Sequence, residues 1–201
     1  MFYKRILTLS VVAAICLLIV GLLPVHGEEE IYDKVVRLHV LANSDSEEDQ
    51  AVKLAVRDAI LDVTVPMLQN CRTKEEAVLL LEENRVLLTR TAETVLREKG
   101  VDDTVNIEMG LENYPTRTYD SLCFPAGEYI SMRVSLGEGE GQNWWCCLFP
   151  PLCLGVATVN EKAAEDACIS VGFTPTQYKI ITESDQPVYR ARFKILELLG
   201  Q

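Results

Sequence analysis

The amino-acid sequence predicts an α+β fold, in which two long helices pack on one face of a mainly antiparallel sheet, after an N-terminal signal or anchor segment. Three stretches of hydrophobic periodicity support this prediction. Hydrophobic residues alternate near residue 36, recur at helical spacing between residues 47 and 99, and alternate again after Gly100.

The first 27 residues have the layout of a signal peptide or a short membrane anchor. Lys4 and Arg5 precede an uncharged run over residues 6–23. Val25 and Gly27 suit cleavage after Gly27, but the run is also long enough to span a bilayer. We expect residues 1–27 to be a signal peptide or a retained N-terminal anchor, with cleavage favoured, and residues 28–201 to be one exported domain.

The balance of charge argues against nucleic acid as a partner. The chain has 19 basic and 30 acidic residues, and residues 1–27 contain only two of the basic ones, Lys4 and Arg5. The exported part therefore has 17 basic and 30 acidic residues, a net charge of −13. Such a chain repels phosphate backbones and anionic lipid headgroups.

A strand is predicted over residues 35–41, because three hydrophobic residues alternate there with Arg37 and His39. We expect this strand to be half-buried, with Arg37 and His39 on its less buried face.

Two helices are predicted after the strand. The first begins at Glu47, which has capping-box spacing from Ser44, and continues towards Pro66. Its core face is expected to carry Val52, Val56, Ala59, Ile60 and Val63. The second begins at a capping box formed by Thr73 and Glu76 and is expected to continue unbroken to Gly100.

Strands dominate the half after Gly100, where residues 105–109 and 130–136 alternate. The residues Pro125-Ala126-Gly127 predict a hairpin turn, and residues 160–168 predict a short helix. Alternation over residues 189–195 predicts a closing strand.

The glycine-rich segment over residues 137–143 is not a phosphate-binding loop. Its spacing is G-x-G-x-G, no Lys-Ser/Thr pair follows, and Glu138 and Glu140 would repel a phosphate. We interpret it as a flexible turn.

The most unusual segment is Asn143 to Cys153, which holds both tryptophans, three cysteines and a double proline. Two interpretations remain open: a buried corner held by a disulfide, or an exposed aromatic patch on a rigid loop. In the buried interpretation, Cys146 or Cys147 pairs with Cys153. If the chain turns back at the prolines, Cys146 and Cys153 come close enough to bond, and we predict this bridge.

Neither a metal site nor a catalytic centre is expected. Six cysteines lie beyond residue 27, but no C-x-x-C occurs and the only histidines are His26 and His39. A Cys146–His39–Asn43 triad can be written for a thiol hydrolase, although nothing in the sequence fixes its geometry. We expect no enzymatic activity, no cofactor and no metal.

Three blocks of sequence resemble the stage II sporulation protein R family of endospore-forming bacteria. They are Arg37-Leu38-His39-Val40-Leu41-Ala42-Asn43-Ser44-Asp45-Ser46, Tyr114-Pro115-Thr116-Arg117 with Pro125-Ala126-Gly127-Glu128-Tyr129, and Gly137-x-Gly139-x-Gly141-x-Asn143-Trp144-Trp145-Cys146-x-Leu148-Phe149-Pro150-Pro151-Leu152-Cys153. With the leader, the resemblance covers residues 1–155. Residues 28–155 are thus expected to be the family-like core, and residues 156–201 a C-terminal extension.

The resemblance implies a signal that the forespore exports into the space between the forespore and mother-cell membranes. There, proteins of this family stimulate a membrane-embedded aspartic protease, stage II sporulation protein GA, which processes pro-sigma-E. We therefore expect an exported signalling protein, secreted or membrane-anchored, that binds this protease. The alternatives are a secreted cysteine-dependent hydrolase acting on the cell wall or a peptide, and a structural adaptor. The residues expected to bind the partner are Trp144, Trp145, Leu148, Phe149, Pro150, Pro151, Arg37, His39, Asn43 and Asp45.

Overall fold

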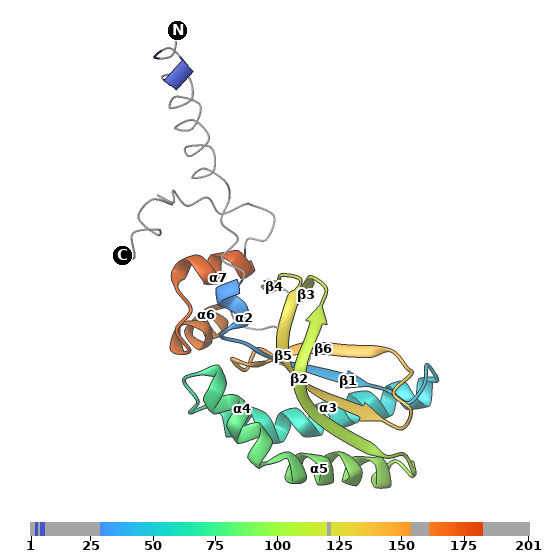
Figure 1. Cartoon of the computed structure of the whole chain (residues 1–201). Coiled ribbons are helices and arrows are strands. Elements are labelled where there is room, and N and C mark those ends of the chain that lie inside the picture. Colours follow the sequence, from blue (N-terminus) through green and yellow to red (C-terminus); the bar gives the residue numbers. More distant parts are fainter. Residues whose placement is uncertain (1–2, 4, 7–28, 120–121, 154–160, 183–201) are drawn as a thin grey trace. The chain divides into compact units, whose positions relative to one another are not determined.

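A four-stranded sheet forms the centre of the protein (Figure 1). The computed structural model describes residues 3, 5–6, 29–119, 122–153 and 161–182. The sheet order is β2-β5-β1-β6, with β2 at Val105–Tyr114, β5 at Gly127–Leu136, β1 at Val36–Leu41 and β6 at Asn143–Phe149. The predicted α+β class is confirmed.

The sheet is mixed, because one of its three strand pairs is parallel. β1 pairs in parallel with β5 and antiparallel with β6, while β2 pairs antiparallel with β5. All six residues of β1 are buried because the strand lies between two neighbours. The expectation that Arg37 and His39 occupy a less buried face is therefore wrong: Arg37 is fully buried and His39 is 8% exposed.

Three helices cover one face of the sheet: α3 at Glu47–Leu68, α4 at Lys74–Glu83 and α5 at Arg85–Glu98 (Figure 1). The first predicted helix is confirmed, but its cap is different. The side chain of Ser46, not Ser44, accepts the hydrogen bond from the Asp49 amide. Apolar side chains of the helices and of this sheet face form one continuous hydrophobic core.

The predicted second helix is in fact two helices, α4 and α5, which meet at Asn84. Thr73 caps α4 as expected. At Asn84 the backbone leaves helical geometry, and its side-chain amide donates to the Leu80 carbonyl at 2.8 Å. A short amide side chain competes with the helix for backbone partners in this way, which explains the interruption. Gly100, with φ at 72°, ends α5 as predicted.

A second, two-stranded sheet consists of β3 (Arg117–Tyr119) and β4 (Leu122–Phe124). Pro125-Ala126-Gly127 is not a hairpin turn, because β4 pairs with β3 whereas β5 pairs with β1 and β2. These residues instead connect the two sheets. The Tyr129 hydroxyl holds the connection by donating to the Pro125 carbonyl at 2.8 Å.

Three further helices complete the described part: α2 at Glu29–Tyr32, α6 at Glu161–Ser170 and α7 at Pro175–Thr182. α6 confirms the helix predicted from residue 160, and α7 was not predicted. The expected closing strand and the expected leader lie outside the described residues, apart from residues 3, 5 and 6. No helix within the described ranges is long and apolar enough to cross a membrane.

Candidate functional site: the His39 face of the sheet

The two tryptophans of β6 point to opposite faces of the sheet. The Arg57 guanidinium of α3 lies 4.3 Å from the ring centre of Trp144, on the helix-covered face. The Arg117 guanidinium of β3 lies 3.9 Å from the ring centre of Trp145, on the other face. Alternation along a strand produces this arrangement. Both indoles are half-buried, so neither belongs to a freely presented loop.

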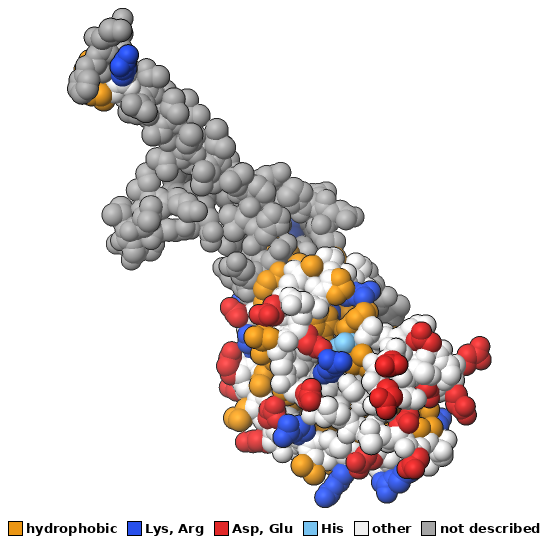
Figure 2. All heavy atoms as spheres, turned by 45° about the vertical axis from the view of Figure 1, so that its right-hand side comes forward, with side chains coloured by type: hydrophobic (Ala, Val, Ile, Leu, Met, Phe, Trp, Pro, Cys, Tyr) orange, Lys and Arg blue, Asp and Glu red, His pale blue; other side chains and the backbone are white. Residues whose placement is uncertain are grey.

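His39 lies at the centre of the face opposite the helices. Its Nδ1 is 3.1 Å from Oε1 of Glu112 in β2, and its Nε2 is 2.6 Å from Oδ1 of Asn143 in β6. Its ring stacks on Trp145 with the ring centres 5.4 Å apart. Figure 2 shows the histidine in pale blue at the surface, with hydrophobic side chains beside it and acidic side chains gathered to its right.

Glu112 links His39 to β5. Its Oε1 is 3.8 Å from Nη1 of Arg133, whose side chain is 45% exposed. The Tyr114 hydroxyl lies 2.7 Å from the Ser131 hydroxyl and donates more weakly to Glu112 at 3.4 Å. Burial raises the pKa of Glu112, but hydrogen bonds from His39 and Ser131 and the charges of His39 and Arg133 together lower it below its ordinary value. Glu112 is thus an ionised centre of this cluster.

Beside this cluster, Arg37 is buried in an aromatic cage. Its guanidinium carbon lies between 4.6 and 5.5 Å from the ring centres of Tyr114, Tyr119, Phe124 and Tyr129. Its Nε donates to the Cys146 carbonyl at 3.0 Å and its Nη2 to the Tyr119 hydroxyl at 2.7 Å. Within the described residues, its Nη1 has no hydrogen-bond partner and no carboxylate pairs with it. Cation–π contacts therefore offset part of the cost of burying this charge.

Comparison with known proteins identifies the family. The sequence matches the family described as Stage II sporulation protein R (spore_II_R) over residues 32–159. This chain belongs to the stage II sporulation protein R family. It is 35% identical over 123 residues to Stage II sporulation protein R of Bacillus subtilis (strain 168), in a match that covers 61% of this chain and 55% of that relative. The chain thus spans about half the length of the curated relative it matches, and no solved structure matches it.

The range matched by the stage II sporulation protein R family contains the whole His39 cluster, from β1 to β6. The helices α6 and α7 lie beyond it. The residues predicted to bind a partner all fall within the matched range, but the structure divides them between four places, one of which is the helix-covered face with Trp144.

Trp145 and His39 are the predicted residues that the structure brings together on the open sheet face. Arg37 lies on the same face but has no exposed surface. Leu148 and Phe149 are 0% and 1% exposed, Pro150 is buried and Pro151 is half-buried. Of the two interpretations of this segment, the buried one therefore holds here: Leu148 and Phe149 end strand β6, and the two prolines form the turn that follows it.

Asn43 and Asp45 fix the glycine-rich segment in place. The Asn43 side chain accepts from the Glu138 amide at 3.0 Å, and the Asp45 side chain accepts from the Gln142 amide at 2.8 Å. A Cβ on Gly137, whose φ is 54°, would lie 2.2 Å from the Asn43 side-chain oxygen. The predicted turn is present, and these hydrogen bonds attach it to the residues that follow β1.

The hypothetical thiol-hydrolase triad is not assembled in this stage II sporulation protein R domain. Cys146 is bonded to Cys153, as predicted, with their Cα atoms 5.6 Å apart. His39 contacts Asn143 and Glu112, while the Asn43 side chain accepts a hydrogen bond from the Glu138 amide of the glycine-rich segment. The four unpaired cysteines of the described part are all buried: Cys71, Cys123, Cys147 and Cys168. Burial raises the pKa of the Cys168 thiol to about 12, which makes it a poor nucleophile.

Glu112 and Arg133 are site residues that the sequence did not indicate. Each stands in an alternating strand, where a charged residue facing away from the core is ordinary. Arg117 and Asn143 stood within the family-like blocks, and this was the available signal for them. No group of three or more potential metal ligands occurs among the residues that the structure describes.

Proposed function

We propose that this protein is an exported sporulation signalling protein. In this proposal it acts in the space between the forespore and mother-cell membranes, where it activates the membrane-embedded aspartic protease stage II sporulation protein GA. The mother cell then processes pro-sigma-E. Membership of the stage II sporulation protein R family supports the sporulation role. Residues 1–27 would serve as the export signal, or as an N-terminal membrane anchor where they are not cleaved.

One structural observation supports a binding role over a catalytic one. On the open sheet face, Trp145 packs between His39 and Arg117, and the half-exposed Arg133 lies opposite His39 on the neighbouring strand β5. Tryptophan and arginine are the residue types that dominate protein interface energies. The thiols that a hydrolase would require are bonded or buried instead.

We propose that this surface, made by Trp145, Arg117, His39, Glu112 and Arg133, contacts the protease. Arg117 and Arg133 present positive charge within a chain whose net charge is −11, so an acidic patch on the protease would be complementary. His39 and Glu112 would act by fixing the orientation of the Trp145 and Arg133 side chains.

The neighbouring tryptophan provides a matched control. Trp145→Ala should reduce pro-sigma-E processing in sporulating cells at least about tenfold, equivalent to ~1.4 kcal/mol of binding free energy. Trp144→Ala removes the same side chain from the helix-covered face. It should lower the thermal transition but reduce processing only in proportion to the folded protein that remains. Immunoblots of pro-sigma-E and of the variant measure both quantities.

Arg133→Glu tests the charge of the surface, with Arg97→Glu on α5 as the control for net charge. We expect the first to impair processing and the second to leave it within about twofold. Normal processing with Trp145→Ala and Arg133→Glu, both present at normal levels, would place the contact surface elsewhere.

A further inference from the structure

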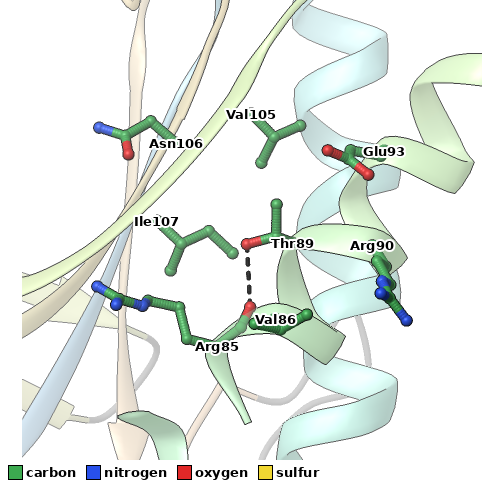
Figure 3. A pocket seen from close by; sticks show the side chains of 8 residues that line it. All are labelled: Arg85, Val86, Thr89, Arg90, Glu93, Val105, Asn106 and Ile107. Atoms are coloured by element: carbon green, nitrogen blue, oxygen red, sulfur yellow. Dashed lines mark hydrogen bonds between the residues drawn. The ribbon is translucent and has the colours of Figure 1, made fainter. Parts of the chain in front are cut away.

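A groove lies between helix α5 and β2, the edge strand at the opposite end of the sheet from β6. It has a volume of about 370 Å³ and is lined by α5 residues including Arg85, Val86 and Thr89 and by Val105 and Ile107 of β2. Figure 3 shows Val105, Ile107 and Thr89 pointing towards one another across it. This groove lies on the helix-covered side of β2, whereas the Trp145 surface, which includes Glu112 of β2, lies on the opposite face of the sheet.

The backbone of β2 has hydrogen-bonding groups directed away from the sheet. Thr104 and Gly137 lie opposite each other, next to the paired residues Val105 and Leu136. The Gly137 amide donates to the Thr104 carbonyl at 2.9 Å, so Thr104 and Gly137 form a hydrogen-bonded pair. Opposed pairs in antiparallel strands alternate between bonded and non-bonded, and the β2–β5 register is continuous. The amides and carbonyls of odd-numbered residues from Val105 to Asn113 therefore point outward. Among the described strands, only β5 pairs with β2.

β2 has two features that leave an edge strand open to pairing, and its charged residues are Glu108 and Glu112. Its sequence, VNIEMGLENY, contains neither lysine nor proline, and it is ten residues long. Two large apolar side chains stand exposed near it: Val86 of α5 is 64% exposed, and Leu111 of β2 is 61% exposed. Leu111 is four residues from Ile107 on the same face of the strand, about 13 Å along it.

The groove is polar at its two ends and apolar between them. Figure 3 shows the Arg85 side chain extending beside Ile107 and the Glu93 carboxylate near Val105. Arg85 is only loosely paired, 3.8 Å from Glu82. The Thr89 hydroxyl donates to the Arg85 carbonyl at 2.9 Å, so its hydrogen bond is satisfied within the helix. An occupant should therefore present alternating apolar or β-branched side chains and an acidic one opposite Arg85.

We propose that the groove binds an extended, acidic segment of a partner protein, which adds to β2 as a fifth strand. Main-chain pairing with the odd-numbered residues of β2 gives affinity, and the α5 side of the groove selects alternate side chains. The alternating part of the chain's own C-terminal segment, residues 189–195, contains Arg190, Arg192 and Lys194 and no acidic residue, so its sequence does not provide the acidic side chain expected opposite Arg85. The inference goes beyond the protease proposal and does not depend on it.

A random decapeptide phage library, selected against the full chain in mild detergent, tests this inference. Enriched peptides should have alternating apolar residues and an Asp or Glu, and synthetic copies should be measured by fluorescence anisotropy. Leu111→Pro removes one outward amide and should weaken binding at least tenfold, whereas Leu111→Ala keeps the amide and should have a smaller effect. The melting temperature of each variant shows whether the fold is retained.

A charge exchange makes the test specific. Arg85→Glu should weaken binding at least tenfold, and replacing the peptide's acidic residue with Lys should restore it. Arg97→Glu makes the same charge change elsewhere on α5 and should have no effect beyond twofold. The inference is overturned if no peptide is enriched, or if neither Leu111→Pro nor Arg85→Glu changes the affinity for the peptide. A photo-crosslinker at Val86 that captures a second copy or the C-terminal segment would overturn it as well.

Discussion

The Cys146–Cys153 bond allows a stability change to be worked out from the chain itself. The two cysteines are separated by seven positions, so the bond closes a short loop. The loop-entropy relation gives a stabilisation of about 2.4 kcal/mol for a loop of this length. For a domain of this size, about 2–4 °C accompany each kcal/mol, so replacing both cysteines with alanine should lower the melting temperature by about 5–10 °C. Loss of buried packing at both positions adds to this decrease.

The assay is thermal unfolding of the full chain by circular dichroism, in one mild detergent, with and without dithiothreitol. Dithiothreitol should lower the melting temperature of the parent towards that of the double variant and should leave the double variant unchanged. Cys147→Ala, which alters the buried neighbour outside the bond, should remain sensitive to the reductant. The reasoning would be refuted if dithiothreitol left the melting temperature of the parent unchanged and the parent and the double variant had the same melting temperature.

Three further predictions concern Arg37, Glu112 and two of the buried cysteines. Arg37→Ala should lower the free energy of unfolding in urea by about 3 kcal/mol or more, because it leaves a cavity and two unpaired acceptors. Arg37→Met should lower it less, because the methionine side chain fills the cavity. Equal losses for the two variants would contradict this. Because the pKa of Glu112 is lowered on folding, its stabilisation is present above its unfolded pKa and is lost as the pH falls through its folded pKa. Glu112→Gln should therefore be less stable than the parent at pH 7, by a difference that shrinks in acid titrations; a constant difference would count against this. Cys147 and Cys168 should resist iodoacetamide in the native chain and react after denaturation, as peptide mapping can measure.

The sequence was most informative where a structure depends on neighbours a few residues apart. Thr73 caps α4 through an amide three residues away, and Gly100 ends α5. The unpredicted helix α7 also had such a signal: Thr174 and Gln177 bond reciprocally as a capping box around Pro175. Periodicity likewise identified β2 and β5, because alternation is a local property of a strand.

Strand order and the environment of each polar residue required the tertiary structure. Nothing local indicates that β1 pairs with both β5 and β6, yet this central position buries Arg37 and His39. The same pairing makes residues 143–149, for which an exposed loop was one of two interpretations, a strand of the sheet. Its two tryptophans therefore lie on opposite faces.

The sequence by itself determined the α+β class, most element positions and the family resemblance, and it predicted the Cys146–Cys153 bond that the structure contains. The tertiary structure alone decided which polar groups meet. His39 is 73 residues from Glu112 and 104 from Asn143, and each of these side chains is ordinary in its own segment. The physical reason is that contacts between distant segments depend on the burial and pairing of whole strands, and no short-range pattern records them.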